Sequence, residues 1–216
     1  MKITLLADNP GSWIVPFAKN WVKELRALGH TAVLVHDHSG IQKGDALFLL
    51  GCEKKLSARI SKRNSYNLVV HESDLPKGKG WSPLTWQILE GKTKIPITLF
   101  KASEKIDGGE IYQKRTMRFR GDELIEELRD AQAAYTWELM LHFIGNYKTA
   151  RFVPQKGRST FYQRRKPDDS RLNVQKSLRD QFDLFRVADN SRYPVFFKYR
   201  GQKYILKIYK REMAAK

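Results

Sequence analysis

The chain of 216 residues is strongly basic: 40 lysines and arginines against 23 aspartates and glutamates give a formal net charge of +17. With 41% hydrophobic residues it is long enough to bury one sizeable core, with room for a small appendage. Cys52 is the single cysteine, which excludes an internal disulfide and a zinc site built from several cysteines. No apolar run approaches the roughly 20 residues that cross a bilayer, so we expect a cytoplasmic protein without a membrane partner.

The positive charge is compatible with three kinds of partner: nucleic acid, an anionic membrane surface or a phosphorylated substrate. The lysines and arginines are dispersed, and no helix-turn-helix, zinc-finger or RNA-recognition signature accompanies them. This pattern disfavours a nucleic-acid partner. A solvated basic surface that aids solubility explains the same composition.

The first 50 residues predict three strands and one long helix. Residues 2–7, 31–36 and 46–50 are short apolar runs typical of buried strands. A helix is expected from about Trp13 to Leu28, ending at Gly29, because large apolar residues recur at helical spacing: Trp13, Phe17, Trp21, Leu25 and Leu28. The turn at residues 8–12 leaves backbone N–H groups at the helix start, where a phosphate can bind. An ordinary capped turn without a ligand explains the same residues equally well.

Two features between the second and fourth strands require interpretation. His36-Asp37-His38 suggests a metal site, but no third ligand follows at a known spacing, and ordinary loop histidines are favoured. Residues 53–63 predict a basic helix with Leu56 and Ile60 facing inward. This helix would lead into the next strand.

The most informative stretch runs from Asn67 to Gly91. Its first five residues read as a buried strand that ends on His71, and ligand sites of open α/β sheets gather outside the carboxyl ends of strands. The glycines of Lys77-Gly78-Lys79-Gly80 allow the backbone to approach an anion, and Ser82-Pro83 predicts an N-cap and a first helical position. Taken alone, His71 is equally well explained as a strand-end histidine bonded to nearby backbone.

The rest of the chain predicts a strand pair, a long helix and a small tail. Residues 95–100 and 111–119 flank a tight turn at Asp107-Gly108-Gly109, where the carboxylate could simply close the turn. Residues 122–144 predict an amphipathic helix whose apolar stripe is core. The tail then predicts a helix from residue 173, carrying Leu178, Phe182 and Phe185, and a hairpin of residues 195–199 and 204–208 around Arg200-Gly201-Gln202.

Together these residues resemble the formyltransferases that use 10-formyltetrahydrofolate. The resemblance rests on the spacing of His71, Ser73, Leu75, Pro76, Gly80, Pro83, Ile88, Gly91, Thr98, Asp107 and Gly109. The variant Ser-Asp-Leu-Pro-Lys-Gly-Lys-Gly-Trp-Ser-Pro most resembles small nucleotide-sugar N-formyltransferases, including those of the pseudaminic-acid route. One departure is Val69, where the family has an asparagine. Asn67 cannot replace it, because four residues of strand place it roughly 13 Å from His71.

The resemblance implies an α/β fold: an open, mostly parallel, Rossmann-like sheet with helices on both faces over residues 1–150. Residues 151–216 would form a small α+β extension packed on this catalytic domain. The segment at 162–170 resembles one that runs back near the active site, where Arg164 and Arg165 would either meet phosphate or pair with Asp168 and Asp169.

The resemblance also assigns roles to single residues. It makes His71 the group that removes the proton of the attacking amine and stabilises the tetrahedral intermediate, with Asp107 orienting its imidazole. A carboxylate beside the ring favours the imidazolium form. It implies no metal, and it assigns folate contacts to Gly51, Cys52, Glu53, Ser73, Leu75, Glu104, Lys105 and Ile106. Substrate contacts are expected at Asn9, Ser12, Trp13, Lys77 and Lys79.

The function implied is transfer of a formyl group from 10-formyltetrahydrofolate to the amine of a nucleotide-linked amino sugar, in polysaccharide biosynthesis. Two alternatives remain open. One is the same chemistry on another amine, such as an aminoacyl group on tRNA or on a carrier. The other is a non-catalytic, nucleic-acid-binding relative, which Val69 favours and the joint presence of His71 and Asp107 opposes. The sugar, the nucleotide and the oligomeric state are left open by the sequence.

Overall fold

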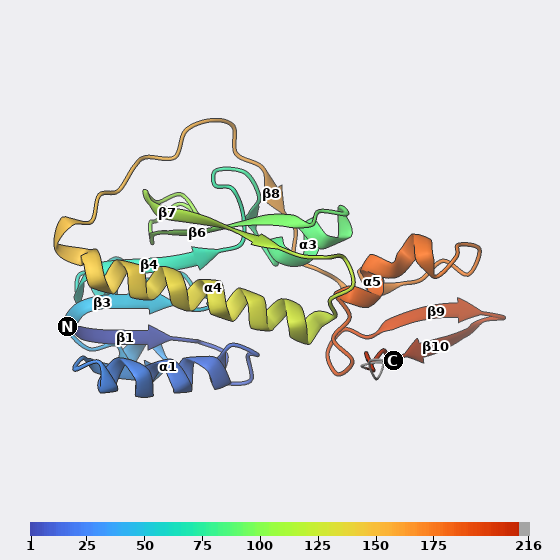
Figure 1. Ribbon diagram of the computed structural model, residues 1–216, viewed down its shortest axis with the longest axis horizontal. Helices are drawn as coiled ribbons and strands as arrows, with labels where there is room; N and C mark the ends of the chain where they lie inside the picture. Colours follow the sequence, from blue (N-terminus) through green and yellow to red (C-terminus); the bar gives the residue numbers. More distant parts are fainter. Residues whose placement is uncertain (212–216) are drawn as a thin grey trace, which may run out of the picture.

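A six-stranded sheet with the strand order β2-β1-β3-β4-β6-β7 forms the centre of the computed structural model, which describes residues 1–211 (Figure 1). Its strands are β1 (Lys2–Leu6), β2 (Thr31–Val35), β3 (Gly44–Leu49), β4 (Asn64–His71), β6 (Lys94–Lys101) and β7 (Ile111–Arg118). The first four are parallel, whereas β6 runs antiparallel to β4 and β7 antiparallel to β6. The predicted α/β class with a mostly parallel sheet is confirmed.

Three helices cover one face of this sheet: α1 (Val15–Ala27), α3 (Pro83–Leu89) and α4 (Ile125–Asn146). Their apolar stripes and the inward residues of the strands form the main core, which includes Leu25 of α1, Leu68 of β4 and Phe143 of α4. Trp21 of α1 stacks on Trp137 of α4 with ring centroids 5.6 Å apart, so the two long helices pack against each other as well as on the sheet.

The opposite face is covered thinly. Its small core is formed by Leu6, Ile41, Leu47 and Leu49, and its single helix, α2 (Ala58–Ser61), has four residues. The prediction of a helix over residues 53–63 is therefore wrong in extent, and helices cover the two faces very unequally. Helix α2 starts later than predicted because the Asp8 carboxylate accepts hydrogen bonds from the backbone N–H groups of Glu53 and Lys54 and holds them in a loop.

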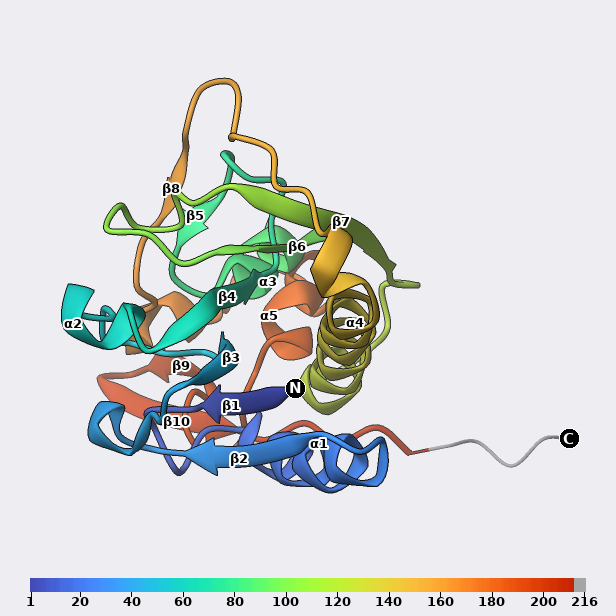
Figure 2. The ribbon, with the colours of Figure 1, turned by 90° about the vertical axis from the view of Figure 1, so that its left-hand side faces the viewer.

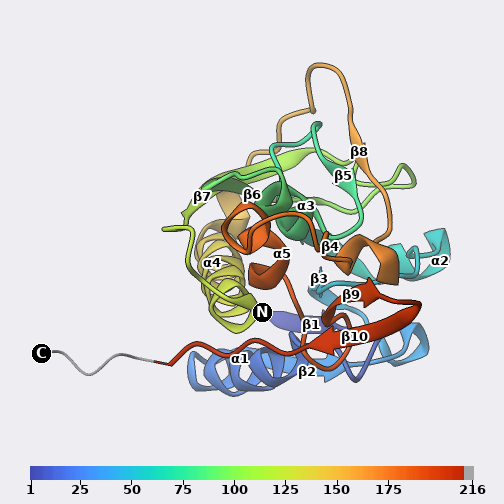
Figure 3. The same ribbon diagram turned by 90° about the vertical axis from the view of Figure 1, so that its right-hand side faces the viewer.

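The chain after α4 returns over the sheet and ends in a separate small unit. Strand β8 (Phe161–Tyr162) pairs in parallel with β5 (Lys79–Gly80), and the two lie side by side in Figures 2 and 3. Beyond them come α5 (Phe182–Arg186) and the antiparallel hairpin of β9 (Val195–Tyr199) and β10 (Gln202–Leu206). Leu172, Phe185, Ala188 and Val195 form their core. The proposed division of the chain near residue 150 stays a prediction.

Two predictions for this unit need adjustment. The helix expected from residue 173 is wrong in extent, because the Gln181 amide binds the carbonyls of Asn173, Lys176 and Ser177 and holds that segment in turns. The hairpin is present, but its loop is Arg200-Gly201 alone. Both loop residues have positive φ (47° and 76°), as a two-residue hairpin turn with matching twist requires.

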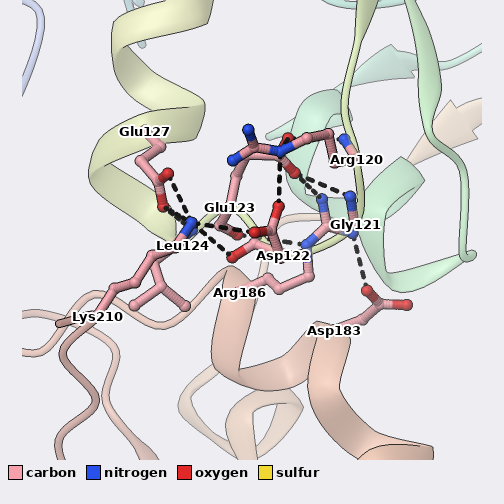
Figure 4. Close-up of polar contacts among 9 residues, drawn as sticks. All are labelled: Arg120, Gly121, Asp122, Glu123, Leu124, Glu127, Asp183, Arg186 and Lys210. Carbon is pink, nitrogen blue, oxygen red and sulfur yellow. Dashed lines mark hydrogen bonds and ion pairs between the residues drawn. The ribbon is translucent and has the colours of Figure 1, made fainter. Parts of the chain in front are cut away.

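A network of charged groups attaches this unit to the start of α4 (Figure 4). The Arg186 side chain, only 2% exposed, donates to the carboxylates of Glu123 (3.1 Å) and Asp183 (2.9 Å). Lys210, near the end of the described residues, binds Glu127 at 2.9 Å and Asp122 at 3.2 Å. The network therefore joins three segments that are remote in sequence. No helix within residues 1–211 is long and apolar enough to cross a membrane.

Acid should weaken this junction. Burial opposes ionisation of Glu123, but the backbone N–H groups of Arg120 and Gly121 and the Arg186 guanidinium outweigh it and hold its pKa below the ordinary 4.5. A depressed carboxyl pKa stabilises the fold above the ordinary value, and that contribution is lost as the pH falls through the folded value. We expect Glu123→Gln to lower the free energy of unfolding by about 3 kcal/mol at pH 7, because Arg186 loses a buried partner.

Urea unfolding at pH 7 and at pH 3.5 measures this effect. The difference between the wild type and Glu123→Gln should shrink at the lower pH, because the contribution of the Glu123 charge begins to be lost once the pH falls below the ordinary carboxyl pKa of 4.5. Glu126→Gln, whose side chain is 78% exposed, is the matched control and should change little. An equal difference at both pH values would contradict the proposed role of the Glu123 charge.

Candidate active site

The carboxyl ends of β1, β3 and β4 lie at one edge of the sheet because the three strands are parallel. Alternation along β4 decides which side chains face which layer. Leu68 belongs to the main core, Val69 packs on the thinly covered face, and His71, two residues further, lies on the same face as Val69. The candidate site therefore lies where loops, rather than long helices, cover the sheet.

His71 is nearly buried, at 7% exposure, with its ring edge-on to Phe100. Its Nε2 atom lies 2.9 Å from the carbonyl oxygen of Gly78. A carbonyl oxygen only accepts hydrogen bonds, so Nε2 carries the proton of the neutral ring and Nδ1 keeps the free lone pair. The structure thus leaves one imidazole nitrogen able to accept a proton.

Asp107 lies beside the same ring, but it is not the hydrogen-bond partner of the imidazole. Its Oδ2 atom is 3.7 Å from His71 Nε2, an ion-pair distance, and accepts a 2.8 Å hydrogen bond from the Gly80 N–H. The bond that orients the imidazole goes to Gly78 instead. Asp107 is therefore placed to stabilise an imidazolium charge rather than to fix the neutral ring.

The turn that carries Asp107 folds back over the His71 face. Because β6 is antiparallel to β4, this turn begins beside Asn67, away from the carboxyl end of β4. Asp107 itself has a left-handed φ of 45°, although it is not a glycine. Gly109 is needed for another reason: a Cβ there would lie 1.8 Å from the Lys101 carbonyl oxygen. The reversal thus depends on close backbone packing.

Val69 places no amide beside His71. Its side chain packs on the small core of the thinly covered face. Asn67 is engaged elsewhere, as expected, because its amide donates to the Ser61 carbonyl at 2.8 Å. An oxyanion formed next to His71 would need another donor, and the protonated imidazole is available for that role.

The residues expected to contact folate lie on three loops around the same face. Gly51, Cys52 and Glu53 follow β3, and Cys52 packs on the same small core as Val69 and Ala102. Burial raises the pKa of the Cys52 thiol to about 12, so it stays protonated and carries no nucleophilic role. Ser73 and Leu75 are buried residues of the loop between β4 and α3, residues 72–82, which we call the catalytic loop. Glu104, Lys105 and Ile106 are exposed on the Asp107 turn.

Two buried polar atoms near this face lack a partner among residues 1–211: one belongs to the predicted folate contact Ser73 and the other to Gln155, which the sequence analysis did not single out. The Ser73 hydroxyl is buried without a hydrogen-bond partner in the described structure, and so is the Gln155 side-chain oxygen. Gln155 reaches the Asp107 turn, where its Nε2 binds the carbonyls of Asp107 and Gly109. Buried polar atoms normally find partners, so two orphaned atoms near one site are compatible with a polar heterocycle such as a pterin.

The residues expected to contact the second substrate are dispersed. Asn9 and Ser12 form a tight turn before α1, and the Arg129 guanidinium lies 5.9 Å from the centre of the Trp13 ring. This turn follows β1 and therefore lies at the carboxyl edge of the sheet. Lys77 is exposed, but Lys79 is only 8% exposed with its ammonium near the Phe161 ring. Lys79 is therefore no freely exposed phosphate ligand.

The catalytic loop is more ordered than its glycines suggest. Lys79–Gly80 form β5, and the Trp81 N–H donates to the Tyr162 carbonyl. The chain then turns at Ser82 with φ of 46°, so the Ser82 hydroxyl does not cap α3, and that prediction is wrong. Pro83 does occupy the start of the helix.

The arginines of the returning segment have protein partners. Arg164 pairs with Glu53 at 3.2 Å and lies 4.5 Å from the centre of the Trp81 ring. Arg165 binds Ser170, so neither of the two meets Asp168. His36 bonds the Ala7 carbonyl, and no group of three or more potential ligands that could hold a metal occurs among residues 1–211.

Glu72, next to His71, points to the other side of the sheet. Its side chain accepts a 2.6 Å hydrogen bond from Gln132 of α4, and its backbone carbonyl accepts one from Gln87. Burial raises the pKa of this carboxyl, although the charge of His71 and the Gln132 bond oppose the shift. A carboxyl held in this way favours the protonated form in the fold.

Replacing Glu72 by glutamine should therefore stabilise the protein at high pH. A raised carboxyl pKa contributes stability below its ordinary value of 4.5, which is lost as the pH rises through the folded value. Glu72→Gln keeps the contact with Gln132 and stays neutral, so its urea midpoint should exceed that of the wild type at pH 8 and match it at pH 4.5. Glu138→Gln, which replaces a half-exposed carboxylate on α4, is the control. A Glu72→Gln variant less stable at pH 8 would refute this account.

In sequence, the chain is similar to methionyl-tRNA formyltransferases, although no family model matches it. It is 25% identical over 169 residues to the methionyl-tRNA formyltransferase of Thermodesulfovibrio yellowstonii, covering 77% of this chain and 51% of that protein. The chain spans about half or less of the length of the curated relatives it matches.

Solved structures share its fold. A methionyl-tRNA formyltransferase from Clostridium thermocellum superposes with a TM-score of 0.81 at 22% identity, covering 98% of this chain and 94% of that one. HypX from Aquifex aeolicus in complex with tetrahydrofolic acid gives 0.77 at 19% identity, covering 96% and 37%. A sugar N-formyltransferase from Shewanella gives 0.68 at 15% identity, covering 99% of both chains. The resemblance predicted from the motifs is thus confirmed.

Proposed function

Because this chain resembles formyltransferases in sequence and in fold, we propose that it moves a formyl group from 10-formyltetrahydrofolate to a primary amine. The observation that carries the proposal is the pair formed by nearly buried His71 and partly buried Asp107, 3.7 Å apart, on a sheet of this fold. A decayed site would have no reason to retain both groups in this arrangement, which argues against a purely binding relative.

The residues of the site fit the proton transfers that formylation requires. The amine attacks the formyl carbon as a neutral nucleophile and must lose a proton once its new C–N bond forms. His71 accepts that proton at Nδ1, the nitrogen left free by the Gly78 bond, and the imidazolium is stabilised by the Asp107 carboxylate. The same imidazolium can donate to the developing oxyanion and then return the proton to the departing nitrogen.

The formyl donor fits the loops on the His71 face. 10-Formyltetrahydrofolate supplies an electrophilic formyl carbon and leaves as tetrahydrofolate. Its pterin would be held by the residues around Gly51–Glu53 and the exposed turn Glu104–Ile106, with Ser73 and Leu75 beneath it. The tetrahydrofolate complex of the HypX structure, which shares this fold, supports a reduced folate as the donor.

A nucleotide-linked amino sugar is the acceptor that we favour. The sugar N-formyltransferase from Shewanella matches this chain over 99% of both lengths, and the catalytic-loop variant resembles that group. The turn at Asn9–Trp13 and the exposed Lys77 would meet the nucleotide phosphates. Cytoplasmic location and polysaccharide biosynthesis stay predictions.

An aminoacyl group on tRNA is the second candidate, and one observation favours it. Residues 151–216 contain 18 lysines and arginines but six aspartates and glutamates, a far stronger positive bias than in the rest of the chain. On the hairpin, exposed Lys198 and Lys203 lie directly opposite each other. Like charges at such positions repel, so a polyanion bound there would relieve the repulsion.

Mass spectrometry of amine acceptors incubated with 10-formyltetrahydrofolate tests the reaction itself. The product should gain the mass of one formyl group, without added metal and in the presence of chelator. His71→Ala and Asp107→Ala should each lower turnover by at least about a hundredfold, the usual scale for a lost acid-base partner. His38→Ala and Asp168→Ala, outside the site, are matched controls. Turnover by His71→Ala near the wild-type rate would remove that residue from the mechanism.

The two acceptors are distinguished by reversing the hairpin charges. If the acceptor is tRNA, Lys198→Glu with Lys203→Glu should raise its KM at least about tenfold, because fewer phosphates are then neutralised by the protein. If the acceptor is a nucleotide-linked sugar, the double variant should keep the wild-type KM. Lys19→Glu with Lys23→Glu, exposed on α1, controls for net charge.

A further inference from the structure

Residues 153–164, which we call the strap, lie across the catalytic loop and the Asp107 turn. The strap begins where Val153 pairs with Ile111 and ends where the Gln163 carbonyl accepts the Trp86 indole N–H. Figure 1 shows this segment leaving the far end of α4 and passing over the sheet to β8. It therefore connects both halves of the candidate site although it belongs to neither.

At one point the strap holds the partner of His71. The Thr160 hydroxyl oxygen accepts a 2.8 Å hydrogen bond from the Gly78 N–H, while the Gly78 carbonyl accepts the 2.9 Å bond from His71 Nε2. The neighbouring Lys79 N–H donates to the Thr160 carbonyl at 2.9 Å. Gly78 has φ of 68°, and a glycine by itself does not hold its backbone in one conformation. The position of the carbonyl that orients the imidazole is therefore fixed from the strap.

At a second point the strap holds Asp107. Gln155 Nε2 donates to the Asp107 carbonyl at 2.7 Å and to the Gly109 carbonyl at 2.8 Å, bridging the turn. Asp107 has a left-handed backbone, which residues with a Cβ rarely adopt. Such a conformation persists when surrounding contacts determine it, and the Gln155 amide supplies two of them.

The strap also explains a glycine of the catalytic loop. Gly80 has φ of 95°, and a Cβ there would lie 2.4 Å from the Tyr162 carbonyl oxygen of the strap. The same Gly80 donates its N–H to the Asp107 carboxylate. The strap backbone passes so close that position 80 requires glycine, and the N–H group of this glycine anchors Asp107 Oδ2.

We propose that the strap is part of the catalytic apparatus, with Thr160 and Gln155 as positioning residues that hold the His71 imidazole and the Asp107 carboxylate together. The expected effects on kcat rest on the proposed formyl transfer. The expected effect on the His71 imidazole does not depend on which reaction the protein catalyses. Thr160 acts through Gly78 on His71, and Gln155 acts through the turn on Asp107.

The kinetic test uses variants that remove one hydrogen-bonding group each. Thr160→Val leaves the Gly78 N–H without its acceptor, and Gln155→Met keeps the approximate size of the side chain while removing the donor without adding a charge. Each should lower kcat at least about tenfold, since displacement of a catalytic group by an ångström costs up to about a hundredfold. Thr160→Ser keeps the acceptor oxygen and should restore most of the rate. For Thr160→Val the KM of the amine should stay within about twofold.

A second readout needs no substrate. In histidine-labelled protein, the imidazole signal of His71, assigned by its loss in His71→Ala, is followed against pH by NMR. Moving the Asp107 carboxylate away from the ring disfavours imidazolium, and methionine adds no charge of its own, so the midpoint of the His71 titration should fall in Gln155→Met. The acid limb of the kcat/KM profile should move in the same direction.

Matched controls separate positioning from folding. Thr149→Val removes a hydroxyl that binds Asn146 outside the site, and Gln163→Met makes the same change as Gln155→Met at an exposed position of the strap itself. Both should behave as the wild type. A His71 titration unchanged in Gln155→Met, or kcat of Thr160→Val equal to that of Thr149→Val, overturns the proposal in folded protein. Absence of turnover in the wild type with every acceptor would instead refute the proposed function, while the His71 titration would still test the strap.

Discussion

Alternation along β4 is the constraint on which the rest of the site depends. Successive side chains of a strand point to opposite faces, so Leu68 enters the core below α1 and α4 while Val69 and His71 lie on the other face. A shift of one residue in register would send His71 into the apolar core. The three parallel pairings of β1, β2, β3 and β4 fix that register.

The unequal cover of the two faces follows from the same arrangement. Long helices fill one face with apolar contacts, whereas the face of His71 is covered by α2 and by loops held together through backbone hydrogen bonds. Loops leave polar groups available to a ligand, which a packed helix would not. The stability of the protein thus comes mainly from one face and its candidate chemistry from the other.

The chain beyond α4 compensates for the thin cover. The strap ties the catalytic loop to the Asp107 turn, and the Arg186–Glu123 junction attaches the terminal unit to the start of α4. In addition to the apolar contact that Val187, directly after α5, makes with the main core, both connections use hydrogen bonds and buried charge. Such contacts require defined geometry, so they position groups more narrowly than hydrophobic packing does.

The sequence by itself determined the order of strands and helices, the place of His71 at a strand end and the turn that carries Asp107, because these depend on local periodicity and turn chemistry. It overextended the helices at residues 53–63 and 173–185, where the side chains of Asp8 and Gln181 bind the backbone instead. Only the tertiary structure decided that Asp107 is left-handed, that Ser82 does not cap α3, and that the strap reaches the site. The Gly78–Thr160 and Gln155–Asp107 hydrogen bonds join residues that are 82 and 48 positions apart. Contacts between residues so far apart in sequence produce no local sequence pattern from which they could be predicted.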